Sequence, residues 1–577
     1  MSSSSPAPRR VAATGPSTTA IFLVLRRMRA PLILLISLFA VSVFGLTLMP
    51  GVDPEGNPWN MDPFQAFYFM SYTATTIGFG EIPYPLSTQQ RMWVIVSIYL
   101  SVVAWAYAIG SILALLQDKG FKEAMSLQRF DRRVRRLREP FLIIAGFGQA
   151  GEMVARSLDR TNHRIVVLDT DATRIEALNL AAFRSDVPGL QADASDPYEL
   201  RRAGLMSSYC EGVIALTDDD QANLAVTMAT ELLRPGLLMV CRTVHDDLIE
   251  RIEEFGSPMV VDPFNLYGDE LMLAIRAPKT YQLISWLTSD PDSQLPKPLR
   301  VPLKGRWVVA GHGDFGQHLA RDLHDHGIPV TVIDPQEGVP ADYRVVHADA
   351  SQPGVLREAG MDEAVAFAAA TDNDTVNLAL LVEAKQLHPG IFTIGRQNDP
   401  TNSPLFATLD VDSMMVPSKI TAHEVLARVA DPLMWRFVQQ AQTRDDAWGG
   451  PLLERITALQ GDELPQVWTF RIAESWTPAI WDRVCAGEVT LGALMHDPQD
   501  RDRRLEIVTL LAQQGDDAIL SPGDDLVLRP DDRLLLTGLS YDRRALDTAS
   551  SVPAAAEYVL TGDRVGSSWI WRTLVDR

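Results

Sequence analysis

The sequence predicts a helical membrane module followed by two related doubly wound α/β domains. Two observations lead to this fold class. Two long apolar segments without charge lie before residue 117, and a glycine-rich strand–turn–helix pattern occurs twice in the middle of the chain. The chain has 577 residues, which is enough for three or four domains.

The two apolar segments are long enough to cross a bilayer. Pro31–Met49 contains 19 residues without a charge, and Met92–Leu116 contains 25. A helix of the shorter length extends roughly 28 Å, close to the ~30 Å hydrocarbon core of a membrane. Buried core helices are usually shorter and are interrupted by polar residues. The first segment starts too late and lacks a following small-residue cleavage site, which argues against a signal peptide.

Charges beside the apolar segments predict the orientation. Arg26, Arg27 and Arg29 precede the first segment, and a basic cluster follows the second. The cluster consists of Lys119, Lys122, Arg129, Arg132, Arg133, Arg135, Arg136 and Arg138. The stretch between the segments is acidic. The positive-inside rule therefore predicts a multi-pass protein of the cell (inner) membrane with both termini in the cytoplasm.

A short helix and a glycine-containing octet lie between the two segments. Asp62, Pro63 and Gln65 form a capping-box pattern that predicts a helix reaching about Thr75. The octet that overlaps its end reads Thr-Ala-Thr-Thr-Ile-Gly-Phe-Gly over residues 73–80. Glycines in such a loop allow backbone conformations that a Cβ would obstruct.

The octet between two spans resembles the selectivity filter of a potassium channel. Such filters replace the hydration shell of K⁺ with backbone carbonyls from four chains. The resemblance assigns the filter to Thr76, Ile77, Gly78, Phe79 and Gly80, with the first four as K⁺ ligands. The preceding helix resembles the pore helix. The chain departs from the family where Tyr72 replaces a buried glutamate of some members, and where Leu100 and Ser101 stand near the usual hinge glycine.

Composition restricts the partners of the distal part. The formal net charge is −21 despite the basic cluster, which argues against nucleic-acid binding. Cys210, Cys241 and Cys485 show neither metal-ligand spacing nor an even disulfide framework, as expected for thiols in a reducing compartment.

The α/β pattern is an internal repeat. In copy one, an apolar strand at 141–145 precedes a G-x-G-x-x-G turn, and a second strand ends at Asp169. Copy two repeats this from 307, and its second strand ends at Asp334. Two Rossmann-like domains are the simplest interpretation.

Each glycine fingerprint predicts a nucleotide site. The glycines permit a tight turn and close approach to a pyrophosphate, the helix N-terminus favours phosphate, and the acid accepts from ribose hydroxyls. The candidate residues of copy one are Gly146, Gly148, Gly151, Asp169 and Asp193, and those of copy two are Gly311, Gly313, Gly316, Asp334 and Asp349. An intact ribose acid favours NAD, ADP or ATP over NADP. The alternative is that the glycines serve packing alone.

Together, filter and repeat resemble the prokaryotic potassium channels that carry tandem RCK (regulator of K⁺ conductance) domains, over roughly residues 27–540. The resemblance implies a ligand-gated channel rather than an enzyme. It implies a homotetramer whose eight RCK domains form one gating ring, and a small C-terminal α+β lobe. The implied domains are a disordered tail at 1–26, a pore domain at 27–118, a linker at 119–140, RCK domains with crossover helices at 141–300 and 301–450, a lobe at 451–540 and a tail at 541–577.

Other interpretations remain open from the sequence. A membrane-anchored NAD-dependent oxidoreductase would use the same fingerprints, although no substrate domain with a positioned acid or base is evident. A nucleotide-binding regulator of a separate potassium transporter would lack a filter. The acidic clusters Asp218–Asp220 and Asp372/Asp374 could supply oxygen ligands for Ca²⁺. Ribose contact or exposure to solvent explains them as well.

Overall fold

The computed structural model describes residues 16–81, 83–254, 258–289, 293–336 and 342–564. The chain separates into two compact units. The first unit holds the membrane module with the residues up to 139 and the short stretches 188–191 and 202–204, and the second holds the rest of both α/β domains and the C-terminal lobe. Residues 1–15 of the predicted N-terminal tail, residues 565–577 of the predicted C-terminal tail and residues 290–292 lie outside the described residues.

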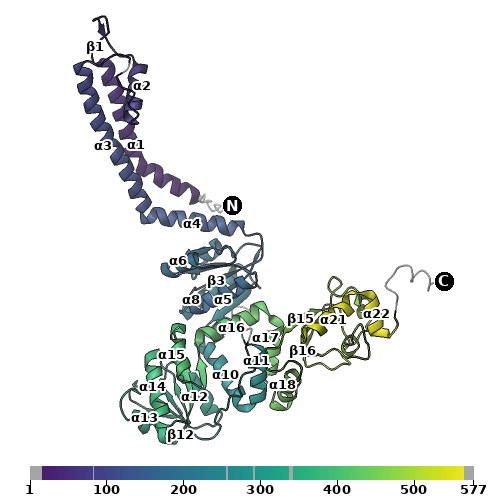
Figure 1. The fold of residues 1–577 in the computed structure, drawn as a ribbon. Helices are drawn as coiled ribbons and strands as arrows, with labels where there is room; N and C mark the ends of the chain where they lie inside the picture. The colour runs from purple at the N-terminus through teal and green to yellow at the C-terminus, as the bar shows by residue number, and fades with distance from the viewer. Residues whose placement is uncertain (1–15, 82, 255–257, 290–292, 337–341, 565–577) are drawn as a thin grey trace, which may run out of the picture. The chain divides into compact units, whose positions relative to one another are not determined.

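In the first unit, three helices form the membrane module. They are α1 (Pro16–Leu48), α2 (Pro63–Ala74) and α3 (Thr88–Gln117), with a short β1–β2 ladder (Gly51–Val52 and Pro58–Trp59) before α2. Long helices α1 and α3 run side by side, and the short α2 lies beside them (Figure 1). Met28–Leu48 and Thr88–Ala114 are long and apolar enough to cross a membrane. Many of their large apolar side chains are exposed, as lipid-facing residues are.

Two predicted segments of this unit contain helix. Helix α1 starts at Pro16, so its first turns lie inside the predicted N-terminal tail. The predicted linker 119–140 is largely helical, because α4 (Lys119–Arg136) is capped by the Asp118 carboxylate and buries Phe130 and Val134. The apolar residues of α4 form one face of the helix, but they are few among its many basic residues, so the amphipathic pattern was weak in the sequence.

In the second unit, the two α/β domains have the same topology. Copy one contains β3 (Phe141–Ala145), α5 (Gln149–Arg160), β4 (Arg164–Asp169), α6 (Ala172–Leu180), β5 (Gly189–Gln191), α7 (Pro197–Arg202), β6 (Cys210–Ala215), α8 (Asp220–Leu233), β7 (Leu238–Arg242), α9 (Asp246–Glu253) and β8 (Met259–Val261). Copy two contains β9 (Arg306–Ala310), α12 (Asp314–Asp325), β10 (Val330–Ile333), β11 (Arg344–Val346), α13 (Val355–Glu358), β12 (Ala364–Ala369), α14 (Asp374–Leu387), β13 (Phe392–Arg396), α15 (Ser403–Thr408) and β14 (Ser413–Met415). The sheets run β5-β4-β3-β6-β7-β8 and β11-β10-β9-β12-β13-β14, which is the Rossmann strand order.

Crossover helices join the two copies reciprocally. Helix α10 (Pro263–Arg276) follows copy one but packs on α12 of copy two. There, Phe264, Tyr267 and Leu271 enter the core of copy two. Helix α16 (Pro417–Ala430) follows copy two but packs on α5 of copy one (Figure 1). Each buried Phe or Leu contributes about 1.5–3 kcal/mol, so the exchange ties both domains together.

The α10–α12 contact holds a carboxylate close to a glycine. A Cβ on Gly268 would overlap the Asp322 carboxylate, so a larger residue at 268 would require that side chain to move. Burial, reinforced by the charge of Asp269, raises the pKa of Asp322 to about 6.

The C-terminal lobe is a four-stranded antiparallel sheet with flanking helices. Its strands β15 (Val467–Arg471), β16 (Ile507–Gln514), β17 (Asp517–Leu520) and β18 (Arg533–Gly538) are ordered β15-β18-β16-β17. Helices α11 (Pro278–Leu287), α17 (Pro432–Ala441) and α18 (Asp446–Gln460) share a core with this sheet.

The lobe extends beyond its predicted end at 540. Residues predicted as tail form α21 (Ser540–Ser551) and α22 (Pro553–Thr561), and Leu546 and Ala556 enter the lobe core. The apolar face of these helices consists mainly of alanines, which gave a weak periodic signal.

Candidate functional site

The predicted filter is a loop that follows the C-terminal end of α2. As the sequence predicts, Asp62 caps α2: its carboxylate accepts from the N–H groups of Phe64 and Gln65, and the Gln65 side chain accepts from the Asp62 N–H. The Tyr72 carbonyl accepts from Ile77 N at 2.9 Å and from Gly78 N at 3.3 Å. These two hydrogen bonds turn the loop back onto the last turn of α2.

Every second residue of the loop has a left-handed backbone. The φ angles are +61° at Thr76, +66° at Gly78 and +94° at Gly80. Alternation of left- and right-handed residues directs successive N–H groups to one side, and the carbonyls can then share the other. At Thr76 this conformation costs about 1–2 kcal/mol, so the surrounding structure must hold it.

Tyr72 braces the loop from behind. Its hydroxyl donates to the Gly80 carbonyl at 2.5 Å, and only 4% of the residue is exposed. Ring centroids of Phe69, Phe79 and Tyr68 lie 5.1, 5.4 and 5.5 Å from that of Tyr72. The sequence showed that Tyr72 departs from the family pattern, and the structure gives the residue a contact that joins both ends of the loop.

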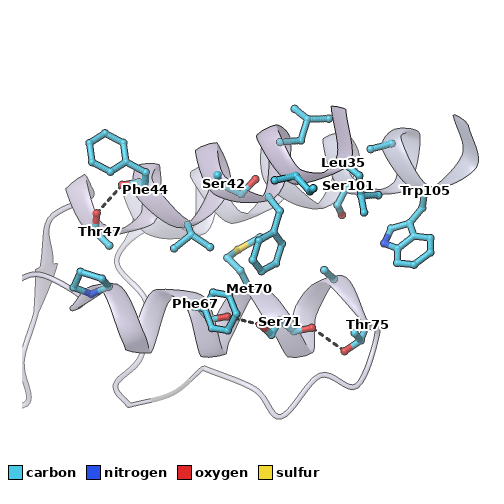
Figure 2. Close-up of a pocket in the computed structure, with 18 residues that line it drawn as sticks. Leu35, Ser42, Phe44, Thr47, Phe67, Met70, Ser71, Thr75, Ser101 and Trp105 are labelled. Carbon is cyan, nitrogen blue, oxygen red and sulfur yellow. Dashed lines mark hydrogen bonds between the residues drawn. The ribbon is translucent and has the colours of Figure 1, made fainter. Parts of the chain in front are cut away.

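An apolar cavity of about 720 Å³ lies between α1, α2 and α3. Figure 2 shows Leu35, Phe44, Phe67, Met70 and Trp105 among its lining. Hydroxyls at the wall donate to carbonyls of their own helices, as Ser71 does to Phe67 and Thr75 does to Ser71. The cavity therefore suits an apolar occupant.

In copy one, the glycine loop borders a cavity of about 600 Å³. The lining includes Gly146, Asp169, Asp171, Arg174, Asp193, Ser195, Thr217, Asp218 and Asp219. These residues come from the loops after β3, β4, β5 and β6, at the carboxyl ends of the strands. That edge is where open α/β sheets bind ligands.

The three glycines of copy one have different roles. Gly146 has φ +96°, and Gly151 would place a Cβ onto the Gly146 carbonyl oxygen, so these two serve the turn and the helix–strand contact. A Cβ on Gly148 would meet only the Arg174 guanidinium, at 3.4 Å. Gly148 is thus the glycine that leaves the loop open to a ligand.

Asp169 is more enclosed than the fingerprint suggests. One carboxylate oxygen accepts from Phe147 N at 2.5 Å and the other from Asp171 N at 2.7 Å. Asp193 is exposed, and its carboxylate accepts from the Ser195 N–H and hydroxyl. Arg174, five residues after Asp169 on α6, was missed from the sequence. Its guanidinium lies 3.4 Å from Asp169 and 3.9 Å from Asp218.

Copy two repeats the backbone arrangement. Gly311 has φ +103°, and a Cβ on Gly316 would overlap the Gly311 carbonyl oxygen. The Asp334 carboxylate accepts from His312 N at 2.7 Å. Like Asp193, Asp349 accepts from the following serine, Ser351. The His312 ring lies 2.8 Å from the Tyr343 hydroxyl, and burial lowers the pKa of that histidine.

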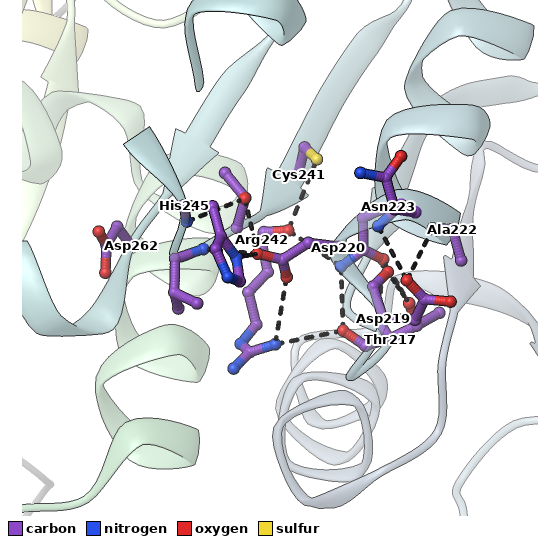
Figure 3. Close-up of polar contacts among 12 residues, drawn as sticks. Thr217, Asp219, Asp220, Ala222, Asn223, Cys241, Arg242, His245 and Asp262 are labelled. Carbon is purple, nitrogen blue, oxygen red and sulfur yellow. Dashed lines mark hydrogen bonds and ion pairs between the residues drawn. The ribbon is translucent and has the colours of Figure 1, made fainter. Parts of the chain in front are cut away.

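The acidic clusters do not converge as calcium ligands. Asp219 caps α8 by accepting from Gln221 and Ala222, whereas the Asp218 side chain is 84% exposed. Asp220 is buried and accepts from the Thr243 hydroxyl and Val244 N, and its oxygen lies 2.8 Å from His245 Nδ1 (Figure 3). This contact raises the pKa of His245. In the described part of the chain, no group of three or more His, Cys, Asp or Glu side chains could hold a metal ion.

Comparison with known families agrees with both modules. A family described as "Ion channel" matches residues 32–118, and the family "TrkA-N domain" matches residues 142–263 and again 307–417. Together these matches cover more than half of the chain.

Relatives include channel proteins. Potassium channel protein 1 of Methanocaldococcus jannaschii is 25% identical over 234 residues, which are 40% of this chain and 68% of that protein. The voltage-gated potassium channel Kch of Escherichia coli is 22% identical over 223 residues, 38% of this chain and 51% of Kch. The chain thus matches about two thirds of one relative and half of the other. A solved structure described as "GsuK channel bound to NAD" is 17% identical to this chain. The aligned part covers 92% of this chain and 99% of the chain in that structure, with a TM-score of 0.45.

Proposed function

Because the chain belongs to the prokaryotic potassium channels that carry RCK domains, we propose that four copies form one potassium-selective pore gated by adenine nucleotides. Both termini lie in the cytoplasm, and the filter loop faces outward, as the flanking charges require. The RCK domains act as ligand-binding regulators, with no catalytic step.

The filter geometry carries the proposal. Left-handed residues at Thr76, Gly78 and Gly80, with two N–H groups anchored on one carbonyl of α2, favour carbonyls that share one side. Rings of the carbonyls of Thr76, Ile77, Gly78 and Phe79 from four chains would replace the hydration shell of K⁺. The Thr76 hydroxyl would add one further ring.

A single chain leaves the filter unprotected, which supports assembly. The side chains of Ile77 and Phe79 are 61% and 59% exposed, although both are large and apolar. The cavity beside α2 is apolar as well. We expect the neighbouring chain's helices to cover these surfaces in a closed four-fold ring. Two RCK domains per chain then supply the eight domains of one gating ring.

The cavity of copy one is the proposed nucleotide site. Gly146 and Gly148 at the start of α5 would receive the phosphates, near the Arg174 guanidinium. Asp169, Asp171 and Asp193 offer carboxylates toward the ribose side. Acids at this position repel a 2′-phosphate, so NAD, ADP or ATP is favoured over NADP.

Reconstitution in vesicles tests this function. The purified channel should pass K⁺ in strong preference to Na⁺, and its flux should change when NAD, ADP or ATP is added on the cytoplasmic side. Gly78→Ala should abolish the flux, because a Cβ at φ +66° is strained. Its matched control is Gly56→Ala, at a loop glycine outside the filter with φ +89°. Equal passage of Na⁺ and K⁺ would refute the pore assignment, and indifference to all three nucleotides would refute the gating assignment.

A further inference from the structure

The two glycine loops correspond in sequence but face opposite charges. At the second glycine, the backbone of such a loop approaches a pyrophosphate. A Cβ on Gly148 in copy one would lie 3.4 Å from the Arg174 guanidinium. A Cβ on the corresponding Gly313 in copy two would lie 3.7 Å from the Asp372 carboxylate. An incoming phosphate therefore meets a cation in copy one and an anion in copy two.

An arginine forms an ion pair with the largely exposed Asp372 carboxylate. Arg396, at the end of β13, lies with Nη1 2.6 Å from Asp372 Oδ1, and 9% of the arginine is exposed. The corresponding arginine of copy one, Arg242, behaves differently. It donates to the Thr217 carbonyl at 3.3 Å and lies 3.9 Å from Asp220 (Figure 3). The Asp218 side chain, which corresponds to Asp372, lies near Arg174 instead.

The different pairing has a local cause. In copy two, amide groups surround the buried Asp374, which corresponds to Asp220. The donors are Asn398 N at 2.7 Å, Asn398 Nδ2 at 3.0 Å, Asp399 N at 3.0 Å and Asn402 Nδ2 at 2.8 Å. Because these amides satisfy Asp374, the guanidinium of Arg396 is available to Asp372.

A second acid reinforces the charge at this loop. Asp314 is the first residue of α12, whereas α5 of copy one starts with Gln149. A carboxylate in the first turn interacts favourably with the positive end of the helix dipole, where a phosphate would otherwise bind. Burial lowers the pKa of Arg396, and the charges of Asp372 and Asp314 oppose that shift.

We propose that copy two carries its own anion: the Asp372 carboxylate, held by Arg396, takes the place of a nucleotide phosphate. Nucleotide then binds to copy one alone, at one molecule per chain. Copy two keeps the glycine loop as a structural element, with the internal carboxylate in the role of a permanent ligand. This inference rests on the proposed nucleotide binding by copy one.

Binding stoichiometry of the full-length channel tests the inference. Equilibrium dialysis with radiolabelled ADP should give one ADP per chain. Arg174→Glu should weaken that binding at least 10-fold, since it reverses the charge beside Gly148. Asp372→Asn should raise the stoichiometry toward two, because it removes the blocking charge at nearly constant shape. Asp362→Asn, the same change at an exposed acid of copy two that lies just before β12, away from the carboxyl ends of the strands, is the matched control and should leave one ADP per chain.

The outcomes separate the inference from the function on which it rests. Two ADP per wild-type chain would overturn the inference and leave nucleotide binding intact. Binding that survives Arg174→Glu, or an Asp372→Asn variant that still binds one ADP, would also overturn it. Absence of binding by the parent and every variant, with ADP, NAD and ATP each used as the probe, would overturn the proposed nucleotide function itself. Gel filtration of each variant, with an elution volume matching the parent, shows that assembly is preserved.

Discussion

Tyr72→Phe tests whether the hydrogen bond behind the filter keeps the pore conducting. The change removes one hydroxyl, which donates to the Gly80 carbonyl at 2.5 Å. The ring contacts with Phe69, Phe79 and Tyr68 are retained by phenylalanine. The variant therefore isolates the hydrogen bond from the packing around it.

The expected effect follows from the net free energy that one partly buried hydrogen bond contributes. Such bonds contribute about 0.5–1.5 kcal/mol, which corresponds to roughly 2- to 12-fold in an equilibrium between conducting and non-conducting filters. Without its donor, the Gly80 carbonyl is free to rotate. At a constant nucleotide concentration, we expect the mean open time of single channels to be shorter in the variant by roughly 2- to 12-fold. Assembly of the channel should not change.

Single-channel recording in bilayers measures this directly. Tyr68→Phe is the matched control, since it removes a hydroxyl from a neighbouring ring that is 47% exposed. Open times that are equal in the parent and the Tyr72→Phe variant would refute the role of the hydrogen bond. An equal shortening in both variants would show that ring polarity, rather than the Gly80 contact, is responsible.

Three further predictions concern the cytoplasmic part, and circular dichroism of the purified channel measures each. Gly151→Ala should lower the thermal midpoint more than Gly148→Ala, because its Cβ would overlap the Gly146 carbonyl oxygen; equal losses would contradict this. Leu271→Ala should destabilise copy two, whose core Leu271 enters, by about 2–5 kcal/mol, and an unchanged midpoint would argue against the exchange of α10. The pKa of Asp322 is raised to about 6, so its contribution to stability is present below its ordinary pKa of about 3.9 and is lost as pH rises through 6. The midpoint should therefore fall over that range, and this part of the fall should be absent from Asp322→Asn; identical pH profiles would exclude the effect.

The sequence predicted the parts of the fold that depend on periodic patterns. Two uncharged segments, the capping box at Asp62 and the duplicated strand–turn–helix units all correspond to elements of the structure. Helix α4 in the predicted linker and helices α21 and α22 in the predicted tail were not recognised, because charge or alanine content weakened the apolar periodicity.

The places of the candidate residues in the fold were predictable from the sequence, but their contacts were not. A fingerprint locates Asp169 at the end of β4, yet it does not show that both carboxylate oxygens accept backbone N–H groups. Asp218 and Asp372 occupy corresponding positions in the two copies, so the sequence likewise gave no sign that they pair with different arginines. That choice depends on the amides around Asp374, which are far from the motif in sequence. The assignment of ligands to individual residues stays a prediction.

The reciprocal placement of α10 and α16 makes each α/β domain dependent on a helix that follows the other domain in the sequence. The sequence position of each of these helices therefore does not show which domain it completes. If the gene were split between the two copies, each product would carry the surface that completes the other, and the fragments would form an obligate pair. Substitutions on α12 and α10 would then have to change together, although they fall in different repeats. Duplication has produced two domains that can no longer evolve separately.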